Sequence, residues 1–176
     1  MPRMKVLSTV EQEAFDTPPD FNSIQRKQFF SFASGILRLA DERRTPVNKL
    51  CFLLSVGYFN FSKRFFPVRS FRRRDIEYVA KHAGIALDAT DIISYDKQSL
   101  RLHQSLILSY YAYQPFNRHA RDFMAQEIET MARLQLKPRL IFWRCVDLLI
   151  RKKIQLPSYF AISEFILKAI NQYKEE

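Results

Sequence analysis

Apolar residues recur three and four positions apart along almost the whole chain, and few segments alternate with a period of two. This spacing gathers apolar side chains on one face of a helix, whereas a half-buried strand would alternate. Only three glycines interrupt the pattern in 176 residues. The sequence therefore predicts an all-α protein.

Cap and turn residues divide the pattern into helices. Thr45 and Pro46 form an N-cap and first-turn pair, and Gly84 follows a helical stripe as a C-terminal stop. A short first helix is expected to begin at a cap formed by Ser8 or Thr9 and to end at the DTPPD run. Further helices are expected at about 23–39, 46–57, 70–83, 97–113, 118–134, 138–153 and 158–174.

The segment Gly84–Asp96 has weaker periodicity and several cap-type residues, so we expect it to join two subdomains. The predicted organisation is an N-terminal segment with a short helix (1–20), a first subdomain (21–90) and a second one (95–176). Both subdomains share a plan of leucine-rich helix, connection and Ser-capped helix. This plan predicts tandem helix-turn-helix-like subdomains.

Charge and composition narrow the class of partner. The formal charge is +10 and the isoelectric point is about 9.8, which favours an anionic partner. Nucleic acid and an anionic membrane surface are the two leading types. No run approaches a membrane span and no secretory signal is visible, so a soluble cytoplasmic protein is expected. Cys51 and Cys145 lie in apolar helical patterns and are expected to be buried and reduced.

The most distinctive stretch, residues 57–74, reads GYFNFSKRFFPVRSFRRR and holds five phenylalanines and six lysines or arginines without a carboxylate. We expect the phenylalanines to pack on the core and the cations to face DNA, with a Ser70-capped recognition helix in the major groove. A merely solvated basic face is the alternative. The candidate DNA-binding residues here are Lys63, Arg64, Arg69, Arg72, Arg73, Arg74 and Lys81.

A second basic cluster comprises Arg144, Arg151, Lys152 and Lys153, at the end of one predicted helix and in the turn that follows. Its layout resembles that of the first cluster, so these four residues are also candidate DNA contacts. The alternative is that the cations interact with a helix C-terminus, which is worth ~0.3–1 kcal/mol.

Signals of catalysis are poor. The three histidines show no metal-ligand spacing with each other or with the cysteines, and the sequence has neither a glycine-rich phosphate loop nor a nucleophile elbow. Carboxylates such as Asp75 and Glu77 fall on helix faces, where a solvated or ion-paired role is expected. Trp143 is expected in the core. We predict no catalytic residue, metal site or cofactor.

Five stretches of the sequence are distinctive and occur in this order: VEQEAFDTPPDFN, NKLCFLLSVGYFNFSKRFF, DIEYVAKHAGI, YDKQSLRLHQSLILSYYAYQPF and IFWRCVDLLIRKKIQLPSY. Together they resemble the N-terminal region of transposases of the Tn-three family of replicative transposons. The resemblance spans nearly the whole chain. One departure from the family pattern is Gln114, which stands where an arginine is commoner.

The resemblance implies binding of double-stranded DNA at the terminal inverted repeats of a transposon, in a bacterial, nucleoid-associated protein. It also implies that this chain is the N-terminal part of a longer transposase whose catalytic carboxylates lie elsewhere. Its R-x-H and I-x-L-P-S-Y motifs add Arg101, Ser158 and Tyr159 to the candidate DNA contacts.

Two rival functions stay open. One is a structural module that holds a transposase homodimer together and contacts DNA incidentally. The other is an amphipathic binder of membrane surfaces, which is disfavoured because the phenylalanines of 57–74 also supply tertiary packing.

Overall fold

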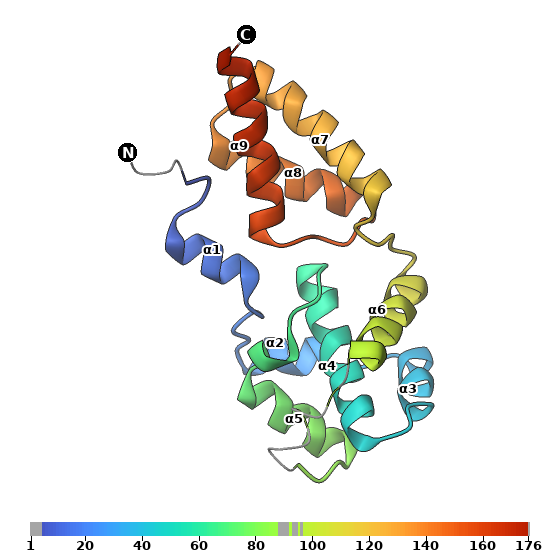
Figure 1. The fold of residues 1–176 in the computed structure, drawn as a ribbon. Coiled ribbons are helices and arrows are strands. Elements are labelled where there is room, and N and C mark those ends of the chain that lie inside the picture. Colours follow the sequence, from blue (N-terminus) through green and yellow to red (C-terminus); the bar gives the residue numbers. More distant parts are fainter. Residues whose placement is uncertain (1–4, 88–91, 93–94, 96, 176) are drawn as a thin grey trace. The chain divides into compact units, whose positions relative to one another are not determined.

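A computed structural model of the chain describes residues 5–87, 92, 95 and 97–175, and within them it is all-α, as predicted (Figure 1). One isolated parallel bridge between Gln114 and Ile154 is the only extended pairing in these residues. The helices are α1 Thr9–Asp16, α2 Ser23–Phe29, α3 Ser34–Asp41, α4 Pro46–Ser62, the 3₁₀ helix η1 Val68–Ser70, α5 Arg73–Ala83, α6 Lys97–Tyr111, α7 Arg118–Arg133, α8 Pro138–Arg151 and α9 Tyr159–Glu175. Among the described residues, none of the helices is both long and apolar enough to span a bilayer.

Three helix starts that were predicted from a local cap are confirmed. Ser8 and Glu11 form the expected capping box, in which each backbone N–H donates to the other residue's side chain at 3.2 Å. The Thr45 hydroxyl accepts the N–H of residue 48 and Pro46 occupies the first turn of α4. Asn117 caps α7 in the same way. These caps act within one turn, so the sequence around them is sufficient to predict them.

Two predicted helix boundaries are wrong, and a long-range contact lies at both of them. The helix expected at 23–39 is divided into α2 and α3, and α4 continues through Gly57 to Ser62 instead of ending near Gly57. Phe30 lies in the break, is 5% exposed, and packs against Gly57. A Cβ atom at Gly57 would lie 2.2 Å from Cε1 of Phe30. Gly57 therefore does not end α4 but makes room for an aromatic ring.

The chain divides into two compact units, a central unit of residues 17–107 and a terminal unit of residues 1–16 and 108–176. This division differs from the predicted one, because the N-terminal segment belongs with the C-terminal helices and the boundary falls within α6. The predicted joint at 84–96 lies in part outside the described residues, which do not include 88–91, 93–94 and 96.

In the terminal unit, α7, α8 and α9 pack on one core, and α1 joins them (Figure 1). The Phe15 ring meets the Phe142 ring edge-on at 5.1 Å, and the N–H of Tyr159 donates to the Asp16 carboxylate at 3.0 Å. Arg139 pairs with Glu11 at 2.6 Å. These contacts explain why α1 belongs to this unit although more than 100 residues separate it from α8 and α9 in sequence.

Both cysteines are buried and free, as predicted. Cys51 is 0% and Cys145 1% exposed, and burial raises the pKa of each thiol to about 12. They act as small apolar core residues. Trp143 was predicted in the core but is 36% exposed, with its ring edge-on to Phe142 at 5.1 Å.

Gly57→Ala should lower the free energy of unfolding. The methyl group would gain ~1 kcal/mol of helix propensity but overpack the Phe30 ring, which typically costs ~1–3 kcal/mol. Urea denaturation followed by circular dichroism measures the difference. In a Phe30→Ala background, which removes both crowding ring atoms, the same substitution should cost less, because only the Phe29 carbonyl oxygen at 3.0 Å still crowds the added methyl group. An equal loss in both backgrounds would contradict the proposed contact.

Candidate nucleic-acid interface

A buried carboxylate sets the position of α5. Asp75, in the first turn, is 0% exposed. The Tyr58 hydroxyl of α4 donates to its Oδ2 at 2.5 Å, and Nε of Arg26 in α2 donates to its Oδ1 at 2.9 Å. Burial, reinforced by the hydrogen bond to Asp75, raises the pKa of Tyr58 well above its ordinary value, so this hydroxyl remains a donor. Three helices are thus joined at one carboxylate.

The start of α5 differs from the prediction. Arg72, not Ser70, is the residue before the helix, and its N–H donates to the Tyr58 hydroxyl at 3.2 Å. The Arg72 guanidinium donates to the carbonyls of Pro18 and Pro19 at 2.8–3.1 Å. Ser70 lies in η1 and donates to the Pro67 carbonyl. Arg72 therefore fastens the 17–22 segment to α5 and is committed to the fold, in contrast to its predicted role as a DNA contact.

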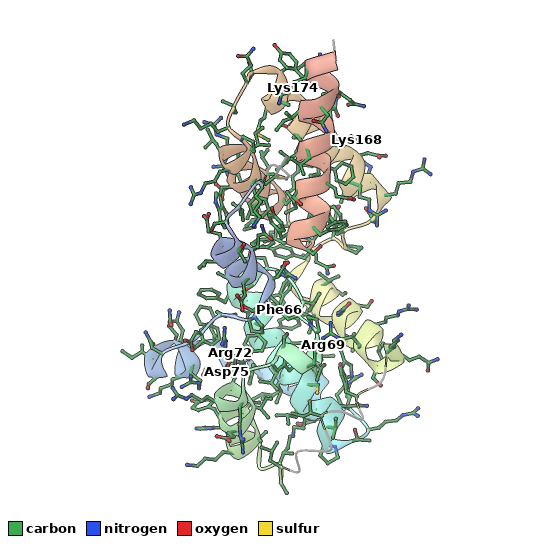
Figure 2. All side chains as sticks on the ribbon, turned by 60° about the vertical axis from the view of Figure 1, so that its left-hand side comes forward. Phe66, Arg69, Arg72, Asp75, Lys168 and Lys174 are labelled. Atoms are coloured by element: carbon green, nitrogen blue, oxygen red, sulfur yellow. The ribbon has the colours of Figure 1, made fainter. Side chains whose placement is uncertain are left out.

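The buried side of α5 determines which residues face solvent. Successive helical residues are ~100° apart, and Asp75, Val79 and Ala80 are buried. The exposed residues of η1 and α5, here called the α5 surface, are Arg69, Arg73, Arg74, Glu77, Lys81 and His82. Figure 2 labels Arg69, Arg72 and Asp75 in the central unit. Four of the seven cations predicted in this region are therefore exposed on one short stretch of structure.

Two other predicted contacts in this region are not fully exposed. Arg64 is 7% exposed, with its guanidinium carbon 4.6 Å from the centre of the Phe66 ring, so it is not a surface cation. Lys63 is half-buried at the end of α4, where its backbone is left-handed with a φ of 57° and its ammonium donates to the Asn60 carbonyl. Burial lowers the pKa of Lys63.

The phenylalanines of 57–74 pack as predicted only in part. Phe59, Phe66 and Phe71 are buried. Phe61 is 45% exposed and covers the rings of Phe21 and Phe29 edge-on. The aromatic residues of this segment thus form part of the core next to the start of α5.

The second basic cluster lies in the terminal unit, and all four of its members are exposed: Arg144, Arg151, Lys152 and Lys153. The Lys152 ammonium stands 5.1 Å from the centre of the Phe123 ring. The Gln114 N–H donates to the Lys153 carbonyl at 2.7 Å, and the carbonyl of Gln114 accepts the N–H of residue 155. This pairing fixes the turn next to the start of α7.

The three candidates taken from the family motifs fall in different places. Arg101 is exposed on α6. Ser158 and Tyr159 are half-buried, and their hydroxyl groups accept hydrogen bonds within the terminal unit. The Ser158 hydroxyl caps α9 by accepting an N–H, and the Tyr159 hydroxyl accepts the N–H of Leu7. The exposed side of α9 is less basic than that of α5: its cations are Lys168 and Lys174, both labelled in Figure 2.

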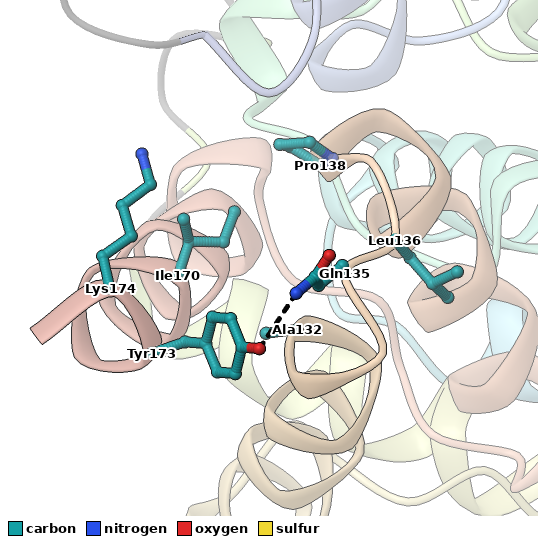
Figure 3. Close-up of a pocket in the computed structure, with 7 residues that line it drawn as sticks. All are labelled: Ala132, Gln135, Leu136, Pro138, Ile170, Tyr173 and Lys174. Atoms are coloured by element: carbon teal, nitrogen blue, oxygen red, sulfur yellow. Dashed lines mark hydrogen bonds between the residues drawn. The ribbon is translucent and has the colours of Figure 1, made fainter. Parts of the chain in front are cut away.

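Among the described residues, no three histidine, cysteine or acidic side chains lie where they could share a metal ion. His103 is buried against the Phe52 ring and contacts the Tyr95 hydroxyl. The terminal unit has an apolar cavity of about 270 Å³, where Gln135 donates to the Tyr173 hydroxyl at 3.0 Å (Figure 3). Its lining is Ala132, Gln135, Leu136, Pro138, Ile170, Tyr173 and Lys174.

A family model described as "Domain of unknown function (DUF4158)" matches residues 6–169. The chain belongs to this family. No curated protein matches the sequence. The matched DUF4158 range includes all of the central unit and most of the terminal unit. The α5 surface and the second basic cluster both lie within it.

Tyr58→Phe should destabilise the central unit. The substitution removes a hydroxyl that donates to a buried carboxylate and accepts the Arg72 N–H, and hydrogen bonds to charged groups contribute ~1.5–3 kcal/mol. Chemical denaturation provides the measurement. Tyr173→Phe is the matched control, because its hydroxyl only accepts from an exposed glutamine and its loss should change stability by less than ~0.5 kcal/mol. Equal effects of the two substitutions would contradict the role given to Tyr58.

Proposed function

We propose that this chain binds double-stranded DNA sequence-specifically through the α5 surface. The observation that carries the proposal is that Arg69, Arg73, Arg74 and Lys81 are exposed on η1 and α5, while Asp75 anchors the opposite side of the helix. A helix whose N-terminal residues reach base edges, with flanking cations on phosphates, is a recurrent arrangement in DNA recognition. Arg73 and Arg74 are the proposed base readers, and Arg69 and Lys81 the phosphate contacts.

The biological target proposed here is the terminal inverted repeat of a transposon. The resemblance to the N-terminal region of Tn-three family transposases supports it, and the DUF4158 domain is the part of the protein that would bind. We propose no catalytic step for this chain and assign strand cleavage to another part of such a transposase. The second basic cluster is proposed to hold the DNA backbone without reading bases.

A second candidate function is a homodimerisation module of the transposase. It is favoured by large apolar side chains exposed on the terminal unit, among them Leu134 at 68% and Phe160 at 65%.

Selection of duplexes from a random-sequence library, followed by gel shift against a scrambled duplex, tests the DNA proposal. Light scattering of the free chain tests the dimer. A dimer that selects no sequence would support the second function over the first.

DNA affinity should fall steeply with salt. Each lysine or arginine that contacts a phosphate releases counterions, and about six to ten contacts would lower the affinity ~10³–10⁵-fold between ~50 and ~200 mM salt. Fluorescence anisotropy with a labelled duplex measures the slope. A flat response would contradict binding through these basic surfaces.

The two basic regions should differ in their effect on specificity. Arg73→Ala should cost ~1–3 kcal/mol mainly on the selected duplex, whereas Lys152→Ala should weaken selected and scrambled duplexes alike and reduce the salt slope by about one. Arg72→Ala should instead lower thermal stability, because the guanidinium holds two backbone carbonyls. The assignment is reversed if Lys152→Ala affects only the selected duplex and Arg73→Ala affects both.

A further inference from the structure

The α5 surface contains one ion pair, between Arg73 and Glu77. Nε of Arg73 donates to Oε1 of Glu77 at 3.0 Å, and the side chains are 90% and 52% exposed. A second pair of the same composition and spacing occurs on α7, where Arg133 meets Glu129 at 2.7 Å. The two pairs differ in the order of their residues and in the guanidinium nitrogen that they use.

Helix stability accounts for the α7 pair better than for the α5 pair. Glu129 precedes Arg133, which lies in the last turn of α7, so the cation is near the negative end of the helix dipole. On α5 the order is reversed, and Arg73 is the first residue of the helix, at the positive end of the dipole. A second cation, Arg74, adds to that charge. Asp75 in the same turn is buried and paired with Arg26, so the exposed charges of the first turn are the two arginines, which suit an external anionic or acceptor-rich ligand.

The contact with Glu77 occupies only one edge of the guanidinium. Nε carries the bond, and the two terminal nitrogens supply four further N–H donors. In the major groove, guanine presents O6 and N7 as a pair of acceptors that matches two parallel donors of an arginine. An arginine held before binding loses less conformational entropy when the base is bound.

We infer that Glu77 positions Arg73 to read a guanine in the major groove. The inference rests on the proposed DNA-binding function and adds to it the class of base and the residue that orients the reader. Glu77 acts through Arg73 and does not itself contact the base. Its carboxylate also repels the phosphate backbone, so it lowers affinity for unselected DNA while it favours the guanine contact.

The test uses the full chain and a duplex selected from a random-sequence library. Each guanine of the selected site is replaced singly by 7-deazaguanine, which removes the N7 acceptor from the major groove, and affinity is measured by fluorescence anisotropy. For the unmodified chain, at least one guanine should be sensitive, with a loss of about fivefold or more, the lower end of the range for a bidentate contact. The guanine read by Arg73 is the one whose sensitivity Arg73→Ala removes.

Four variants distinguish positioning from a general charge effect. Arg73→Ala and Glu77→Ala should both lose the sensitivity to that guanine, and Glu77→Ala should bind scrambled DNA more tightly. Glu77→Gln should retain the sensitivity, because the amide oxygen can still accept from Nε. Glu129→Ala, which breaks the matched pair on α7, should behave like the unmodified chain. Thermal unfolding by circular dichroism verifies that each variant is folded.

The failures are distinguishable. If Glu77→Ala binds every duplex more tightly and keeps its sensitivity to the same guanine, Glu77 is only a repulsive charge and the inference is overturned while DNA binding stands. If no guanine is sensitive although a sequence is selected, the inference also fails. If the unmodified chain selects no sequence, the proposed function fails and the inference fails with it.

Discussion

The buried carboxylate of Asp75 is the constraint on which the candidate interface depends. An unpaired charge in a protein interior costs several kcal/mol, so Asp75 must remain between Arg26 and Tyr58. Rotating α5 by one residue, ~100°, would withdraw the carboxylate from both partners. The same constraint directs Arg73, Arg74 and Lys81 to the exposed side. The position of the buried Asp75 thus determines which basic residues of α5 are exposed.

The aromatic residues of the central unit support this arrangement. The centre of the Tyr58 ring lies 5.3–6.1 Å from the ring centres of Phe21, Phe30, Phe66 and Phe71. Rings packed at these distances hold the phenol hydroxyl where Asp75 needs a donor. Gly57, one residue earlier, lets Phe30 approach α4 closely enough to complete the cluster. The aromatic and basic residues of 57–74 therefore have linked roles, since the rings build the support for the helix that carries the charges.

Local signals in the sequence predicted the fold class and most helix starts, since caps such as Ser8, Thr45 and Asn117 act within a single turn. The features that sequence reasoning missed depend on distant partners. Arg26 and Asp75 are 49 residues apart, and Asp16 and Tyr159 are 143 apart. The same limit applies to the site. Arg64 and Arg72 lie in the same basic stretch as Arg69, Arg73 and Arg74, but only the folded chain shows that the first two are used internally.

Chemical-shift mapping of backbone amides by nuclear magnetic resonance tests the central claim most directly. The full chain, labelled with nitrogen-15, is titrated with a duplex selected from a random-sequence library. If α5 carries the interface, the largest shifts should fall on η1 and the first two turns of α5, with smaller shifts in the Arg151–Lys153 turn. Shifts concentrated on α9 with α5 unchanged would contradict it.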